Sequence, residues 1–340
     1  MRRIAGLIAL LLMLGLTGFS CSHAVRASEP PAAKSPSATA AVASATAKSP
    51  GAATSPSASK SPSASESTGA AQTTPSANTV SSTTSTKTYT MKVAGLTRTY
   101  EVVAPLKALP KSAPVLVVLA GIGAKIPAEI TRDEFVPYVS TDKAELVYPV
   151  GEGATWNAIG CCGYAWTHRV NDLAFLTALM AKVDPGHARP SYLVGYSNGA
   201  RLAYRVACTT PSLYNGYGMV KGGPEADCVV RKPTSIIQLA SLDDPELAYN
   251  PGGKGREPIP VTTEVARLRA AFKCPAKSAV AHPGNMSSLL TWSGCASGTR
   301  VALATWKDGK HSFPRPPASV PAASQVIWSF ITKTALAPLP

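Results

Sequence analysis

The stretch Gly195-Tyr196-Ser197-Asn198-Gly199 decides the fold of this chain, because it joins two segments with different periodicities. The apolar run Ser-Tyr-Leu-Val at 191–194 precedes it and predicts a buried β-strand. The segment Ala-Arg-Leu-Ala-Tyr-Arg-Val-Ala at 200–207 follows it and predicts a helix. A serine on such a tight turn projects its hydroxyl outward, and the flanking glycines let the strand and the helix pack closely. Ser197 is therefore the candidate nucleophile.

A strand, a G-x-S-x-G turn and a helix in this order form the nucleophile elbow of α/β-hydrolases. Further buried strands are predicted by apolar runs at 114–120, 145–150, 235–240 and 299–305. Helical patterns alternate with them at 169–183, 198–208, 261–272 and 320–335. This alternation predicts an α/β fold with a mostly parallel central sheet and helices on both faces. The segments 87–94 and 97–104 predict an antiparallel hairpin at the edge of that sheet.

A serine hydroxyl needs a general base, and the base needs a group that orients it. In α/β-hydrolases these follow the serine in the order acid, then histidine, on loops after later strands. Asp243 and Asp244 come directly after the strand at 235–240, and from the order alone either is the acid. Of the five histidines, only His282 and His311 come after the serine in the chain. His282 lies in a stretch rich in Pro and Gly, whereas His311 lies on the loop after a strand predicted at 299–306. Ser197, one of these aspartates and His311 are the candidate catalytic residues.

Several blocks, in order, resemble the secreted polyhydroxybutyrate depolymerase and feruloyl esterase group of the esterase-D-like carbohydrate esterase family. The resemblance covers about residues 95 to 335. The blocks are Arg-Thr-Tyr-Glu-Val-Val-Ala-Pro (98–105), Val-Leu-Val-Val-Leu-Ala-Gly (115–121), Tyr-Pro (148–149), Thr-Trp-Asn (155–157), Cys-Cys-Gly (161–163), Asn-Asp-Leu-Ala-Phe-Leu (171–176), the elbow with its helix (192–208), Leu-Asp-Asp-Pro (242–245), Tyr-Asn-Pro-Gly-Gly (249–253) and His-Ser-Phe-Pro (311–314).

The resemblance implies a serine esterase that acts on hydroxyalkanoate polyesters or feruloyl-type esters without a cofactor or a metal. In the family the acid stands just before a proline, which favours Asp244. The oxyanion loop of the family begins His-Gly, whereas this chain has Ala120-Gly121-Ile122-Gly123. Because the oxyanion hole uses backbone N–H groups, we expect the donors at Asn198 and Ile122, with Gly121 as the alternative to Ile122.

Two aromatic residues are candidates for substrate binding. Phe313 stands where the family often has tryptophan, two residues after the predicted catalytic histidine. Trp156 is either a wall of the acyl pocket or a core aromatic, and the sequence does not decide between the two.

The N-terminus has the pattern of an export signal. Met1-Arg2-Arg3 is followed by an apolar run to residue 19, which predicts a signal peptide over 1–20. Cys21 comes next and favours lipidation, with cleavage after Ala27 as the alternative. Residues 21–88 consist mainly of Ser, Ala, Thr and Pro and predict a disordered tether, which leaves 89–340 as one catalytic domain. We expect an extracellular or cell-surface protein, attached to the membrane if Cys21 is lipidated.

Cysteine usage agrees with export. Beyond Cys21 the chain has six cysteines, an even number, which predicts three disulfides. Cys274 and Cys295 bracket one strand region and are expected to pair. Cys161 and Cys162 would then pair with Cys208 and Cys228. No spacing of Cys or His predicts a zinc site.

The net charge is +14; seven Lys/Arg and two Glu precede residue 89, so +9 remains on the domain. The basic residues are spread singly and form no nucleic-acid-binding motif, so we expect no nucleic-acid partner. The expected partner is an ester substrate, either a polyester or an acylated polysaccharide, bound by a monomer. Two alternatives remain at this point: a non-catalytic lipoprotein that binds envelope polymer on a hydrolase fold, and an acyltransferase that uses the same triad.

Overall fold

The computed structural model describes residues 83–307 and 310–340. The expected signal peptide at 1–20, the expected lipidation site Cys21 and the expected tether up to residue 82 lie outside the described residues. In the described part of the chain, no helix has the length and apolar character that crossing a membrane requires.

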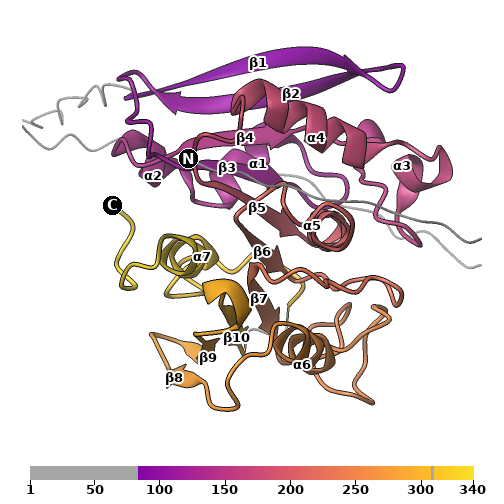
Figure 1. The fold of residues 1–340 in the computed structure, drawn as a ribbon, viewed down its shortest axis with the longest axis vertical. Coiled ribbons are helices and arrows are strands. Elements are labelled where there is room, and N and C mark those ends of the chain that lie inside the picture. The colour runs from indigo at the N-terminus through magenta and orange to yellow at the C-terminus, as the bar shows by residue number, and fades with distance from the viewer. Residues whose placement is uncertain (1–82, 308–309) are drawn as a thin grey trace, which may run out of the picture. The chain divides into compact units, whose positions relative to one another are not determined.

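A ten-stranded sheet forms the centre of the described residues, with the strand order β1-β2-β4-β3-β5-β6-β7-β10-β9-β8 (Figure 1). The strands from β4 across to β10 run parallel to one another, whereas the pairs at both edges are antiparallel. The strands are Thr84–Val93 (β1), Leu96–Pro105 (β2), Val115–Leu119 (β3), Glu145–Pro149 (β4), Ser191–Tyr196 (β5), Gly216–Val220 (β6), Ser235–Ser241 (β7), Ala279–Ala281 (β8), Met286–Trp292 (β9) and Val301–Trp306 (β10).

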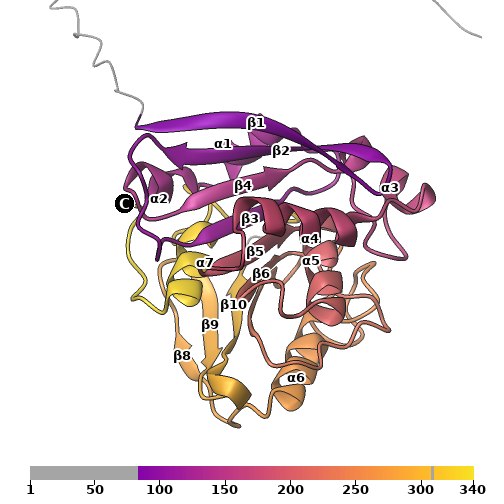
Figure 2. The same cartoon turned by 45° about the horizontal axis from the view of Figure 1, so that its top comes forward.

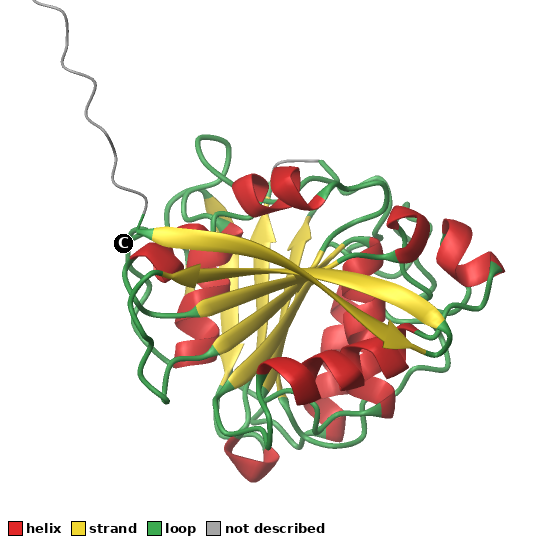
Figure 3. Cartoon of the chain, turned by 90° about the horizontal axis from the view of Figure 1, so that it is seen from above, coloured by secondary structure: helices red, strands yellow, loops and turns green. Residues whose placement is uncertain are grey.

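Helices cover both faces of the sheet (Figure 3). They are Ile126–Arg132 (α1), Val136–Ser140 (α2), Gly163–Thr167 (α3), Asp172–Val183 (α4), Asn198–Thr209 (α5), Val261–Ala271 (α6) and Ala323–Thr332 (α7), with 3₁₀ turns at Glu152–Ala154 (η1) and Ala296–Gly298 (η2). One hydrophobic cluster holds the apolar residues of α4, α5 and α6, and a second cluster holds those of α1, α2 and α7. Neighbouring strand residues alternate between the clusters, as Val117 and Val118 of β3 do.

This mostly parallel, helix-covered sheet has the α/β-hydrolase arrangement, which confirms the fold class expected from the sequence. All five buried strands and all four helices predicted from the sequence are present. The structure adds elements that the sequence analysis missed: β6, β8, β9 and the three short helices α1, α2 and α3.

The predicted edge hairpin is also present, and it is longer than expected (Figure 2). Its turn at Ala94 and Gly95 has positive φ angles of 49° and 82°, as a tight two-residue hairpin turn requires. Strand β1 begins at Thr84, so residues 84–88 of the expected tether belong to the sheet. Thr84 pairs with Pro105, near where Val103 pairs with Leu146 of β4. The hairpin therefore begins at the end of the sheet where the parallel strands start.

The disulfides differ in part from the expected pairing. Cys274–Cys295 is formed as predicted. The prediction that Cys161 and Cys162 pair with Cys208 and Cys228 is wrong, because the structure joins Cys161 to Cys162 and Cys208 to Cys228. Cys161 and Cys162 line a cavity with Ser197, at the start of α5. Cys208 lies ten residues further along α5, about 15 Å away at the helical rise, with its Cα 5.7 Å from that of Cys228.

Candidate active site

Ser197 lies on the sharp turn between β5 and α5, as the sequence predicts. Its backbone angles, φ 52° and ψ −118°, are unusual for a residue with a side chain. The neighbouring glycines make the turn possible. A Cβ atom on Gly195 would collide with the carbonyl of Gly199, and one on Gly199 would collide with the carbonyl of Leu119 in β3.

The structure brings the serine, one aspartate and the histidine into a hydrogen-bonded chain. His311 Nε2 lies 2.9 Å from Ser197 Oγ. His311 Nδ1 lies 3.0 and 3.1 Å from the two carboxylate oxygens of Asp244. Each residue follows the carboxyl end of a parallel strand, namely β5, β7 and β10, so the three meet at one edge of the sheet. Asp243 is exposed on the same loop and is not part of this chain of hydrogen bonds.

Local hydrogen bonds hold Asp244 in place. Its side chain is fully buried and accepts hydrogen bonds from the backbone N–H groups of Glu246, at 2.8 Å, and Leu247, at 3.2 Å. The carboxylate therefore faces His311 with little freedom to turn. A carboxylate fixed in this way selects the histidine tautomer that carries its proton on Nδ1.

Two residues that the sequence analysis missed hold the backbone at His311. The Tyr196 hydroxyl donates a hydrogen bond of 2.8 Å to the carbonyl of His311. Lys221, which follows β6 and is fully buried, donates from Nζ to the carbonyl of Lys310 at 2.5 Å. The position of Tyr196, directly before the serine, is a signal that sequence reasoning could have used. Lys221 gives no such signal.

The predicted oxyanion loop after β3 lies beside the serine. Asn198 is the first residue of α5, where backbone N–H groups have no acceptor within the helix. Ile122 is 54 % exposed and lines the same cavity as Ser197. The N–H of Gly123 is bonded to the carbonyl of Ala154 at 2.8 Å, which leaves Ile122 and Gly121 as the loop's candidate donors. The Tyr196 ring is so close to Gly121 that a Cβ atom there would lie 2.9 Å from its Cδ1.

Neither predicted substrate-binding aromatic lines this cavity. Trp156 is 2 % exposed and donates from its indole N–H to the carbonyl of Ala120 at 2.9 Å. Phe313 is 4 % exposed and packs edge-on against Tyr196. Of the two roles open for Trp156, the structure shows the core aromatic, and its hydrogen bond anchors the start of the oxyanion loop.

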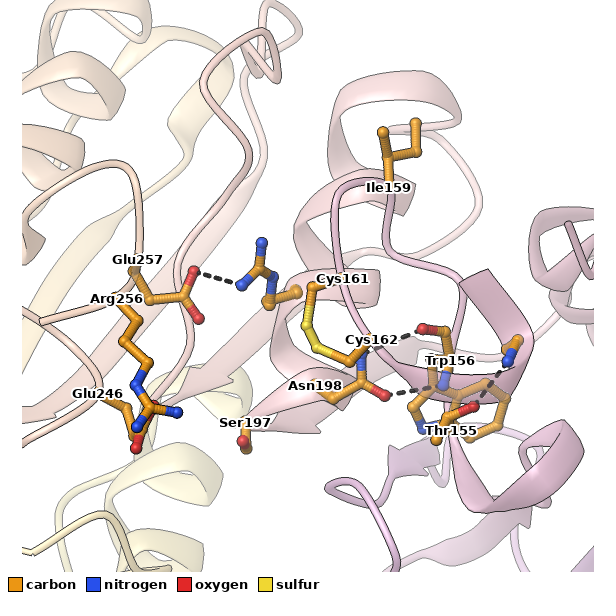
Figure 4. Close-up of a disulfide and its surroundings, with 12 residues drawn as sticks. Thr155, Trp156, Ile159, Cys161, Cys162, Ser197, Asn198, Glu246, Arg256 and Glu257 are labelled. Carbon is orange, nitrogen blue, oxygen red and sulfur yellow. Dashed lines mark hydrogen bonds and ion pairs between the residues drawn. A yellow bond between two sulfur atoms is a disulfide. The ribbon is translucent and has the colours of Figure 1, made fainter. Parts of the chain in front are cut away.

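The cavity at Ser197 has a volume of about 470 Å³. It is lined by Ile122, Cys161, Cys162, Ser197, Asn198, Arg201, Glu246, Arg256, Glu257 and His311. Figure 4 shows Glu246, Arg256 and Glu257 on one side of Ser197, and the Cys161–Cys162 disulfide with Asn198 on the other. The cavity therefore has two chemically different sides.

Ion pairs organise the charged side. Arg201 Nη1 lies 3.0 Å from Glu257 Oε2, and Arg201 also pairs with Glu225. Arg256 Nε lies 3.3 Å from Glu246 Oε2. Burial raises the pKa of Glu257 to about 7, against the opposing effects of Arg201 and His311. This carboxyl group therefore titrates near neutral pH, inside the cavity.

No group of three or more His, Cys, Asp or Glu residues that could hold a metal ion occurs within 83–307 and 310–340. The residues that meet at the cavity can supply a hydroxyl nucleophile, an imidazole base and backbone N–H donors.

No protein-family model matches the chain. A protein of Nocardia uniformis subsp. tsuyamanensis named "Putative esterase NocK" is 27% identical over 251 residues, which cover 65% of this chain and 72% of that protein.

Among solved structures, the "Putative Dienelactone Hydrolase" of Klebsiella pneumoniae subsp. pneumoniae has a TM-score of 0.48 at 14% identity, covering 74% of this chain and 99% of its own. A carboxylesterase from Mesorhizobium loti has a TM-score of 0.43 at 15% identity, covering 69% of this chain and 94% of its own. Likenesses at this level carry no information about activity.

Proposed function

We propose that this protein is a serine esterase that hydrolyses carboxylic esters through an acyl-enzyme. The observation that carries the proposal is the continuous hydrogen-bonded chain from Ser197 Oγ through the His311 ring to the Asp244 carboxylate. These residues stand in the chain order of α/β-hydrolases, and the fold is of that class. The similarity to a protein named a putative esterase supports the same reaction class.

In the first half of the proposed reaction, Ser197 Oγ attacks the carbonyl carbon of the ester. His311 Nε2, 2.9 Å away, takes the hydroxyl proton. Asp244 keeps the other ring nitrogen protonated and stabilises the imidazolium that forms. The tetrahedral intermediate collapses when the alkoxide leaves with the proton from His311, and the acyl group stays on Ser197. Water then attacks the acyl-enzyme with His311 again as base, and this step releases the carboxylic acid and the free serine.

The oxyanion of each tetrahedral intermediate needs donors that are already in place. The backbone N–H groups of Asn198 and Ile122 are the proposed pair, because both residues line the cavity at Ser197. The Trp156 indole supports this loop through the carbonyl of Ala120. The absence of the family's usual histidine does not remove a backbone donor.

The substrate subtype follows from the resemblance alone, which favours hydroxyalkanoate polyesters or feruloyl-type esters. We also propose that the protein is exported and monomeric, and that a lipid on Cys21 attaches it to the membrane. The three disulfides support an oxidising compartment.

Hydrolysis of short-chain p-nitrophenyl esters by the full chain, produced in an oxidising compartment, tests the proposal. We expect turnover, and we expect Ser197→Ala to lower kcat by at least about 10⁴-fold. A serine-directed phosphonate should label the wild type and not the variant. Folded wild-type protein with neither turnover nor labelling would reject the esterase and support the non-catalytic polymer-binding alternative.

A further inference from the structure

The wall of the catalytic cavity opposite the charged residues is a disulfide between adjacent cysteines. Cys161 and Cys162 line the cavity together with Ser197 and Asn198 (Figure 4). Ile122 extends this wall, since a Cβ atom built on Gly163 would lie 3.7 Å from its Cδ1. A disulfide carries no charge and only weak hydrogen-bonding capacity, so it presents an apolar surface.

The two sides of the cavity correspond to the two halves of an ester. The leaving alcohol has to lie where His311 Nε2 can protonate it. His311 is bonded to Asp244, and the Asp244 carboxylate accepts a hydrogen bond from Glu246 N–H at 2.8 Å. Glu246 and its partner Arg256 therefore line the His311 side, where the alcohol leaves.

The acyl group then faces the other side. Its carbonyl oxygen points to the proposed donors at Asn198 and Ile122. Asn198 lies on the disulfide side of Ser197 in Figure 4, and Ile122 lies beside Gly163, the residue after the disulfide. The acyl chain leaves the carbonyl carbon away from the alcohol on the His311 side, and the disulfide is the surface that lines the cavity there.

Loop 155–162, which carries the disulfide, is held firmly against the core. The Asn198 side chain accepts from Trp156 N–H at 2.7 Å and donates to Trp156 carbonyl at 3.1 Å. Asn157 N–H donates to the Asp172 carboxylate at 2.7 Å, and the buried Arg98 pairs with that carboxylate at 2.8 Å. A wall supported in this way can discriminate between acyl groups of different length.

We propose that the Cys161–Cys162 disulfide is the surface that contacts the acyl group and sets the preference for its length. This proposal rests on the esterase function proposed above. The disulfide is thus a specificity-determining element, in addition to a crosslink.

The test is the dependence of kcat/KM on acyl length for p-nitrophenyl acetate, propanoate, butanoate and hexanoate, which share one alcohol. In the full-length wild type, we expect each methylene of the acyl chain that contacts the disulfide to raise kcat/KM by up to about fourfold. In Cys161→Ser/Cys162→Ser, which replaces the sulfur wall by two hydroxyls, we expect the rise from acetate to butanoate to disappear. The control Cys274→Ser/Cys295→Ser removes a disulfide outside the cavity lining and should keep the wild-type dependence.

Each outcome decides between roles. If kcat/KM of Cys161→Ser/Cys162→Ser fell by the same factor for all four esters, the disulfide would only support the loop. This result would overturn the proposal. A wild-type kcat/KM that does not change with acyl length would overturn the proposal as well. Wild-type protein without Ser197-dependent turnover would instead reject the proposed function itself, which separates the two failures.

Discussion

The Tyr196 hydroxyl donates a hydrogen bond of 2.8 Å to the backbone carbonyl of His311, so the residue before the proposed nucleophile holds the proposed general base. The two residues are 115 positions apart in the chain. Lys221 holds the preceding carbonyl, that of Lys310, at 2.5 Å. The histidine loop is thus positioned from strands β5 and β6 as well as from its own strand β10.

Replacing Tyr196 by phenylalanine should loosen the loop that carries His311 without changing the residues that line the cavity. One hydrogen bond is worth about 0.5–1.5 kcal/mol, so we expect kcat to fall by about two- to tenfold with little change in KM. Steady-state kinetics on a p-nitrophenyl ester measure the effect. Tyr192→Phe, the same change four residues earlier on β5, is the control. Equal effects of the two substitutions would contradict a specific role for the Tyr196 hydroxyl.

The adjacent aspartates offer a matched pair of variants. Asp244→Asn keeps the shape but favours the wrong histidine tautomer, and we expect kcat to fall by about 10⁴-fold. Asp243→Asn changes an exposed side chain and should keep kcat within about twofold. Comparable losses in both variants would reject Asp244 as the orienting acid.

A substitution at the elbow should act through stability. A methyl group at position 199 would collide with the Leu119 carbonyl, so Gly199→Ala has to displace β3 or α5. We expect the free energy of unfolding to fall by about 3 kcal/mol or more, as measured by urea denaturation. Gly218→Ala is the control, because its Cβ atom would lie 3.4 Å from Ile327, at ordinary contact distance. Similar stability of the two variants would contradict the close approach at residue 199.

Stability should also depend on pH through Glu264 of α6. Burial raises the pKa of this carboxyl group to about 7, although Arg267 opposes the shift. Between the ordinary value of 4.5 and about 7, the folded state binds more protons than the unfolded state. The free energy of unfolding therefore falls as pH rises through this range and levels off above it.

In Glu264→Gln, the side chain at position 264 is an amide, which does not titrate between pH 5 and pH 8. From urea unfolding at pH 5 and pH 8, we expect the wild type to lose up to about 3 kcal/mol more than the variant between the two pH values. Identical losses in the wild type and the variant would show that Glu264 titrates normally in the folded protein.

The parts of the site that sequence predicted best are those with a local signal. Ser197, the aspartate pair and His311 each follow an apolar run, and the carboxyl ends of parallel strands meet at one edge. The choice between Asp243 and Asp244 has no such signal, because both lie on the loop after the same strand. The resemblance favoured Asp244, and the structure places that carboxylate against His311.

What the sequence did not predict depends on contacts between distant segments. Lys221 meets Lys310 across 89 residues, and only the sheet order brings β6 near the loop after β10. Strand β6 itself was missed, since the glycines in Gly-Tyr-Gly-Met-Val weaken the strand pattern. The pairing of Cys161 with Cys162 depends on where loop 155–162 lies, which spacing along the chain does not reveal.

The direction of strand β1 has a practical consequence. Thr84 lies at the end of the sheet where the parallel strands start, whereas Ser197 and His311 lie where they finish. Immobilisation through residues before Thr84, on a bead or an electrode, would therefore attach the domain at the end opposite Ser197 and leave the cavity at Ser197 facing the bulk solution. A fusion partner or affinity tag at that end should be tolerated for the same reason.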